Sequence, residues 1–155
     1  MAYWIYKCNS RNGEHQRHYG DWQDFFRNAR ANTAKEWGTS EIVPALAKLE
    51  PNDVVIAYQT DRNELVGVTK VAELVPRDEF FDVMLTPVER IGVKVRPLKL
   101  ADQRIAEIPA LKAGPIMTLY RISHNEAQLL LRAARSAASE QDTDGRRSIP
   151  KAKRR

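Results

Sequence analysis

Residues 53–74 place the strongest constraint on the fold, because two runs of β-preferring residues flank a short polar connection. The first run, Asp53–Thr60, contains two valines, an isoleucine and a tyrosine, and the second run is Leu65–Leu74. Four polar residues, 61–64, separate the two runs. Two such runs so close together are typical of a β-hairpin. The sequence therefore predicts a fold built on a sheet that contains these two strands.

Other segments supply further strands to this sheet. Tyr3–Cys8 is rich in aromatic and β-preferring residues and predicts an early strand. In Arg90–Arg96 the apolar residues occupy every second position, which is typical of a strand with one buried side. Strands are also predicted at Phe80–Leu85 and at Ile116–Ile122.

Helices are predicted early in the chain. Asp21 is a suitable N-cap for a short helix, because apolar residues recur at helical spacing from Trp22 to Ala29. A second helix is predicted over Glu41–Leu49, where Pro44 falls near the tolerated first turn.

Helical signals return towards the end of the chain. The apolar spacing of Leu98–Gly114 predicts one or two short helical turns, broken by Pro109. Ser123 and Glu126 have the Ser-x-x-Glu spacing of a capping box, which predicts that a helix begins there and continues through Ala134.

The size and the order of these elements define the expected architecture. A chain of 155 residues is long enough for one domain with its own core. Successive strands with helices at the margins predict the α+β class, as a curved sheet or small β-barrel flanked by helices. We expect the domain to occupy residues 1–138.

The last residues are expected to form a disordered basic tail, residues 139–155. The segment after Ser139 contains too few apolar residues to build a core. The net charge of the chain is +5, and residues 136–155 contribute +3 of it. Such a tail could attract phosphate groups without sequence selectivity, or it could be a solubilising end with no partner.

The sequence gives no indication of a membrane partner. Its first residues lack the basic lead and long apolar run of a signal peptide. No apolar stretch reaches the length of a membrane span. We therefore expect a cytoplasmic protein.

Patterns typical of enzymes and metal sites are missing. The seven glycines form neither a phosphate-binding loop nor a nucleophile elbow. His15 and His18 are three residues apart and Glu14 lies outside them, unlike the helical zinc motif. The lone Cys8 excludes an internal disulfide and is expected to be buried on the first strand. We expect no catalytic residue, no cofactor and no metal.

The aromatic residues are concentrated in the first half of the chain, where eleven of the twelve lie by position 81. Trp22, Phe25 and Phe26 are expected to pack in the core. Trp37 differs because it adjoins Gly-Thr-Ser at a predicted junction between a loop and a helix. It could cover the core as a lid or form the wall of a pocket. Neighbouring hydroxyl groups and amides could hydrogen-bond a flat polar ligand such as an unstacked base.

Several segments also follow one another in the order of a known family's motifs. Residues 3–7, Tyr-Trp-x-x-Lys, are similar to that family's first strand, and residues 19–25 are similar to its first helix. Residues 48–60 and 66–71 are similar to its two central strands, and the segments 98–111 and 121–123 to those that close the domain. Together they resemble the EVE domain, a PUA-like relative of the YTH readers.

The resemblance implies a non-enzymatic reader that binds a modified, methylated base of DNA or RNA in an aromatic cage. Trp37 matches the position of a cage tryptophan, and residues 37–40 also resemble a YTH stretch. The implied base-contacting residues are Trp37, Asn9, Thr39, Ser40, Tyr58 and Thr60. Basic residues around the mouth of the pocket, Arg11, Arg17 and Arg62, are expected to contact phosphate.

Two other classes of function remain open at this point. The chain could be a protein-interaction module of an RNA-processing or DNA-defence system, acting through its basic tail. It could also be a nuclease-associated enzyme that uses Glu14, His15 and His18. Metal analysis and a nuclease assay would separate the enzyme from a reader.

Overall fold

The protein is built on one mixed sheet of six strands. The computed structural model describes residues 1–9, 21–39, 44–112 and 118–153, with side chains up to residue 142 except at residues 38 and 39. The strands lie in the order β2-β5-β4-β3-β1-β6. Their bounds are β1 Tyr3–Cys8, β2 Lys35–Thr39, β3 Val54–Gln59, β4 Glu64–Pro76, β5 Phe81–Lys94 and β6 Leu119–Ile122.

The predicted hairpin is confirmed at the centre of this sheet. β3 pairs antiparallel with β4, and Asn63 in the connection adopts a positive φ of 50°, which asparagine tolerates better than most residues. β5 continues the antiparallel meander next to β4. β1 runs parallel to β3, so the carboxyl ends of these two strands lie side by side.

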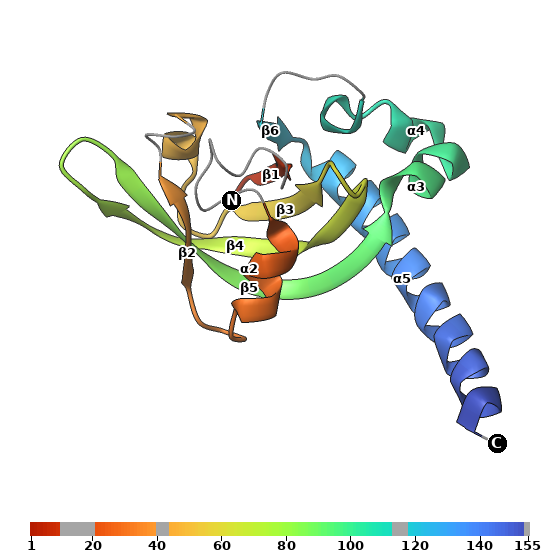
Figure 1. The fold of residues 1–155 in the computed structure, drawn as a ribbon. Coiled ribbons are helices and arrows are strands. Elements are labelled where there is room, and N and C mark those ends of the chain that lie inside the picture. Colours follow the sequence, from red (N-terminus) through yellow and green to blue (C-terminus); the bar gives the residue numbers. More distant parts are fainter. Residues whose placement is uncertain (10–20, 40–43, 113–117, 154–155) are drawn as a thin grey trace.

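The sheet is strongly curved and open. Register shifts interrupt the pairing of β4 with β5 at three places, and such bulges bend a strand and increase its twist. Figure 1 shows both strands sweeping around the body of the protein. The strand order leaves β2 and β6 at opposite edges. The curved α+β sheet is therefore confirmed, whereas a closed barrel is wrong for the described residues.

Helices cover both faces of the sheet. Helix α2, Trp22–Asn28, lies in front of the sheet in Figure 1. Helices α3, Val95–Ala101, and α4, Gln103–Ala106, lie together near the first half of α5, His124–Lys153. Two 3-10 turns, η2 Pro44–Lys48 and η3 Pro109–Leu111, complete the described elements.

Two of these helices begin where the sequence predicts. The Asp21 side chain accepts a hydrogen bond of 3.1 Å from the Asp24 amide and caps α2. At the start of α5, the Glu126 amide donates to Ser123 Oγ at 3.0 Å and the Ser123 amide donates to Glu126 Oε1 at 2.8 Å. This reciprocal pair is the predicted capping box, which satisfies amides that the helix itself leaves unpaired.

Three predicted elements differ from the structure. The strands predicted at 80–85 and 90–96 join into the single 14-residue β5, because the residues between them continue the pairing with β4. The helix predicted over 41–49 is a 3-10 turn from Pro44, and residues 41–43 lie outside the described part. Trp37 lies on β2, not at a junction between a loop and a helix.

The last helix is longer than predicted. α5 extends to Lys153 and therefore runs through the segment expected to be disordered. Its second half projects away from the body of the protein (Figure 1). The division into a domain of residues 1–138 and a separate tail stays a prediction. No helix within the described ranges is long and apolar enough to cross a membrane.

The two faces of the sheet contribute to two separate cores. Alternate residues of β1 point to opposite sides, so that Tyr6 joins one core and Ile5 the other. The first core, under α2, is rich in aromatic rings, and we call five of its six aromatic residues, Tyr6, Trp22, Phe25, Phe26 and Trp37, the aromatic cluster; the sixth is Trp4. The second core, under α3, α4 and α5, is mainly aliphatic.

Candidate functional site

Trp37 lies inside the aromatic cluster. Its side chain is 2% exposed, and its indole stacks on that of Trp22 with 3.6 Å between ring centroids and 4° between planes. Tyr6 and Phe25 lie nearly perpendicular to it, with centroids at 5.5 and 5.4 Å. Of the two roles that the sequence left open, Trp37 therefore has the packing of a core residue. Another flat ring can stack on it only on the face that Trp22 does not cover.

Hydrogen bonds hold Trp22 in this stack. Its indole Nε1 donates to the Tyr6 carbonyl at 3.1 Å, and its backbone amide donates to Gln59 Oε1 at 2.7 Å. Gln59 is fully buried, and its Nε2 donates to Asp61 Oδ1 at 2.7 Å. Gln59 thus connects the end of β3 to the start of α2.

Gln59 was not among the residues predicted from the sequence, although the sequence contains a signal for it. On β3 the side chains of Val55 and Ala57 enter the aromatic core, and residue 59 continues that alternation. A polar residue at an inward position of a strand needs a buried hydrogen-bond partner. The pattern alone could have marked Gln59 as a residue that holds another element.

Asn9 and Thr60 are brought close together, as the predicted site requires. The Thr60 amide and hydroxyl both donate to the Cys8 carbonyl, at 2.8 and 2.9 Å. Asn9 follows Cys8 directly, so the two residues leave the sheet side by side at the carboxyl ends of the parallel strands β1 and β3. Polar groups at such adjoining strand ends are well placed for binding.

Tyr58 is placed on the other face of the sheet. It belongs to the aliphatic core, and its hydroxyl donates to Asn63 Oδ1 at 2.9 Å. Lys7 Nζ lies 5.5 Å from the centroid of the Tyr58 ring and 5.6 Å from that of Tyr120. Because Trp37 belongs to the aromatic core, the structure does not bring Tyr58 and Trp37 together.

Burial shifts the pKa values of Lys7 and Tyr58, and a neighbouring charge adds to the shift of Lys7. Burial lowers the pKa of Lys7, and the nearby charge of Lys99 lowers it further. Burial raises the pKa of Tyr58. The contact of the ammonium group with two aromatic rings partly compensates for the water that it has lost.

The other predicted residues are distributed as follows. Thr39 is at the end of the edge strand β2, opposite Asp82. Arg62 is exposed in the β3–β4 connection, and its carbonyl accepts a hydrogen bond of 2.8 Å from Lys94 Nζ. Ser40, Arg11, Arg17, Glu14, His15 and His18 lie outside the described residues.

Cys8 has the predicted structural environment. It is 1% exposed on β1, and burial, followed by the charges of Asp21 and Asp61, raises the pKa of its thiol well above the ordinary value. A thiol that stays protonated is a poor nucleophile and a poor metal ligand. Within the described part of the chain, no group of three His, Cys, Asp or Glu residues could hold a metal ion.

Comparison with known proteins identifies the fold. No family model and no curated protein matches the sequence. Solved structures do match over nearly their whole length. A Rhodopseudomonas palustris protein has a TM-score of 0.63 at 17% identity, over 86% of this chain and 93% of that one. An Agrobacterium tumefaciens protein has a TM-score of 0.61 at 17% identity, over 88% and 92%.

A third structure is the human THYN1 protein in complex with 5-methylcytosine-containing DNA. It has a TM-score of 0.61 at 11% identity and covers 86% of this chain and 98% of its own. This chain has an EVE-like fold. The EVE-like fold predicted from the motifs is thus confirmed, although the individual residues have diverged widely from those of each matched structure.

Proposed function

We propose that this EVE-like chain is a non-enzymatic nucleic-acid reader that recognises a modified base. The observation that carries the proposal is the shared fold with human THYN1, whose structure contains 5-methylcytosine DNA. The sequence motifs point independently to the same family. The absence of phosphate-loop and nucleophile-elbow patterns agrees with a binding function.

The base would be presented single-stranded or flipped from a duplex, because within a duplex its pairing edge is hydrogen-bonded and its flat faces are stacked on neighbouring bases. We place its polar edge at the carboxyl ends of β1 and β3, where Asn9 and Thr60 meet, with Thr39 and Ser40 contributing from the end of β2. The exposed position of Arg62 suits a phosphate contact. Arg11 and Arg17 are proposed for the same role.

Trp37 would act from within the aromatic cluster. Because Trp37 is 2% exposed, a base would stack on the indole face away from Trp22 only after the groups that cover that face move aside. Such stacking contributes about 1–3 kcal/mol per base. Tyr58 lies on the opposite face of the sheet, so its proposed contact with nucleic acid would be separate from the stacking on Trp37.

A binding panel tests this function. Short DNA and RNA oligonucleotides, with and without methylated cytosine or adenine, are titrated at a stated salt concentration. We expect the wild type to prefer one modified oligonucleotide. Trp37→Phe, which keeps an aromatic ring in the core, should weaken that preference by about fivefold or more, equivalent to about 1 kcal/mol.

Trp4→Phe is a matched control, because it makes the same change in the same core at a residue hydrogen-bonded to Asp53. It should lower stability without changing the preference for the modified base. Equal affinity of the wild type for all modified and unmodified oligonucleotides would disprove modified-base recognition. Equal effects of the two variants would remove Trp37 from the binding site.

A further inference from the structure

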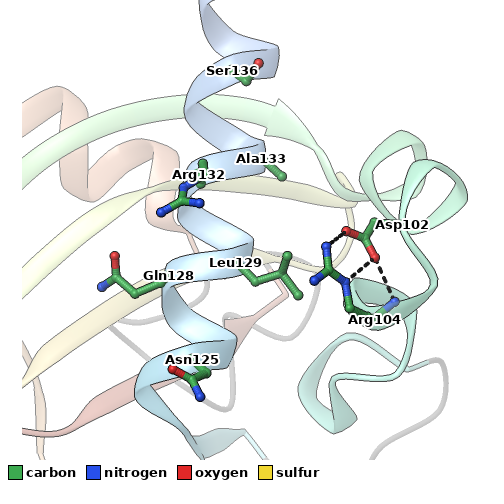
Figure 2. Close-up of a pocket in the computed structure, with 8 residues that line it drawn as sticks. All are labelled: Asp102, Arg104, Asn125, Gln128, Leu129, Arg132, Ala133 and Ser136. Atoms are coloured by element: carbon green, nitrogen blue, oxygen red, sulfur yellow. Dashed lines mark hydrogen bonds and ion pairs between the residues drawn. The ribbon is translucent and has the colours of Figure 1, made fainter.

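A pocket on the aliphatic side of the sheet has no role in the function proposed above. It has a volume of about 430 Å³ and lies between α4 and the first half of α5. Figure 2 shows Leu129 pointing from α5 towards Arg104, with the Arg132 side chain further along the same helix. Its lining residues are Asp102, Arg104, Asn125, Gln128, Leu129, Arg132, Ala133 and Ser136.

The lining of the pocket contains two arginines, Arg104 and Arg132, but only one carboxylate, that of Asp102. Its single carboxylate, Asp102, is already engaged, because Arg104 Nε donates to Oδ1 at 3.1 Å and Arg104 Nη2 donates to Oδ2 at 2.8 Å. These hydrogen bonds also lower the pKa of Asp102, which therefore stays ionised. Among the described residues, Arg132 has no hydrogen-bond or ion-pair partner, so one guanidinium charge remains uncompensated.

The other polar lining residues include groups that can donate a hydrogen bond to an anion. Asn125 carries a carboxamide and Ser136 a hydroxyl group, both on α5, whereas the Gln128 carboxamide already donates to the Tyr3 hydroxyl at 3.4 Å. Leu129 and Ala133 are apolar lining residues of the pocket. A planar guanidinium with neighbouring amide and hydroxyl donors matches the oxygens of a phosphate group.

The helix continues beyond the pocket with further positive charge. α5 is 30 residues long, which corresponds to about 45 Å at 1.5 Å per residue. Residues 137–144 include three acidic residues, whereas residues 145–155 carry six basic residues and no acidic one. Such a concentration of positive charge in one stretch of sequence suits an extended polyanion better than a small ion.

We infer that the groove between α4 and α5 is a second nucleic-acid contact, in which Arg132 and the groove's amide donors hold backbone phosphates. This inference rests on the proposed nucleic-acid partner and adds a surface distinct from the base-reading residues. Contacts to phosphate position the protein on nucleic acid without reading its sequence. The groove therefore contributes affinity and salt dependence, and the modified-base site contributes selectivity.

The test measures the salt dependence of binding by the full chain. Labelled duplexes with and without 5-methylcytosine are titrated by fluorescence anisotropy between about 50 and 200 mM salt. Loss of one phosphate contact should reduce the slope of log affinity against log salt by about 0.7–0.9. Arg132→Gln should accordingly lower affinity about five- to eightfold near 0.1 M salt, for both duplexes equally.

Two further variants sharpen the measurement. Arg30→Gln makes the same charge change at an exposed residue in the turn after α2, and it should leave the slope unchanged. The double variant Asp102→Asn/Arg104→Gln removes the internal ion pair without changing net charge. It should reproduce little of the Arg132→Gln effect if Arg132 makes the phosphate contact. Thermal unfolding should confirm that Arg132→Gln retains the wild-type stability.

The outcomes separate this inference from the proposed function. If Arg132→Gln behaves like Arg30→Gln while the wild type still prefers the methylated duplex, the groove contact is wrong and the reader stands. If Arg132→Gln lowers the slope but the wild type shows no preference among modifications, the groove stands and modified-base reading is wrong. If the wild type binds neither DNA nor RNA, both proposals are overturned.

Discussion

The two cores of this protein are built by different means. On the α2 side, flat rings pack in perpendicular and stacked pairs, and Trp22 is held by directed hydrogen bonds to the Tyr6 carbonyl and to Gln59. On the α5 side, branched aliphatic side chains such as Ile56 and Leu130 are fully buried. The first core depends on the relative orientation of a few large groups, and the second depends on the area that many smaller groups remove from water.

The two kinds of core suit different kinds of function. An aromatic core offers flat faces and buried hydrogen-bonding groups, which are the features needed to receive a base. An aliphatic core supports a surface such as the α4–α5 groove, whose apolar lining residues Leu129 and Ala133 pack against that core. The two proposed contacts therefore lie on opposite sides of one sheet.

The largest expected effect comes from truncating the centre of the aromatic core. Trp22→Ala removes the ring stacked on Trp37 and the hydrogen bond that its Nε1 donates to the Tyr6 carbonyl, so we expect a loss of about 3–5 kcal/mol in the free energy of unfolding. Leu130→Ala, in the aliphatic core, should lose about 2–5 kcal/mol. Urea denaturation measures both.

Tryptophan fluorescence of the same two variants distinguishes the two cores. Trp22→Ala should change the emission of Trp37 in the folded protein, because the stacked partner is gone. Leu130→Ala should leave the folded-state spectrum close to that of the wild type. Identical spectra for both variants would mean that the stack does not form in solution.

A smaller loss of stability is expected at Gly67, where the Phe26 ring lies close to the backbone of the sheet. A Cβ at Gly67 would lie 2.5 Å from both the Glu89 carbonyl oxygen and Phe26 Cζ, so Gly67→Ala should cost about 1–3 kcal/mol through overpacking. Gly92 has open space around it but a φ of 69°. Gly92→Asn should therefore be tolerated better, since asparagine adopts this conformation more easily than alanine. Equal midpoints of thermal unfolding for Gly67→Ala and the wild type would contradict the close approach.

The smallest expected effect is a pH-dependent change in stability that arises from Lys7. Because its pKa is lowered in the folded state, the unfolded chain binds more protons between that pKa and the ordinary value of 10.5. The contribution of Lys7 to stability therefore rises with pH across this window. Relative to the wild type, the free energy of unfolding of Lys7→Met should be most favourable at neutral pH. This advantage in stability should disappear as the pH approaches 10.5. Denaturation curves at several pH values would show a constant difference if Lys7 were fully hydrated.

Much of the local structure could be predicted because its causes lie within a few residues. The hairpin follows from two β-preferring runs and a polar connection. The caps at Asp21 and Ser123 each depend on an amide three residues further on. The burial of Cys8 follows from its place on an early strand. Periodicity and capping act over one or two turns of chain, so the sequence displays them directly.

The sequence by itself determined these local elements and the order of motifs that indicates an EVE-like domain. Tertiary structure alone decided the surroundings of Trp37, because stacking on Trp22 depends on how β2 and α2 meet across the sheet. It likewise placed Tyr58 on the face of the sheet opposite Trp37, although both residues belong to the site predicted from the sequence. The physical reason is that these contacts depend on strand register and on the packing of distant elements, which no short stretch of sequence contains.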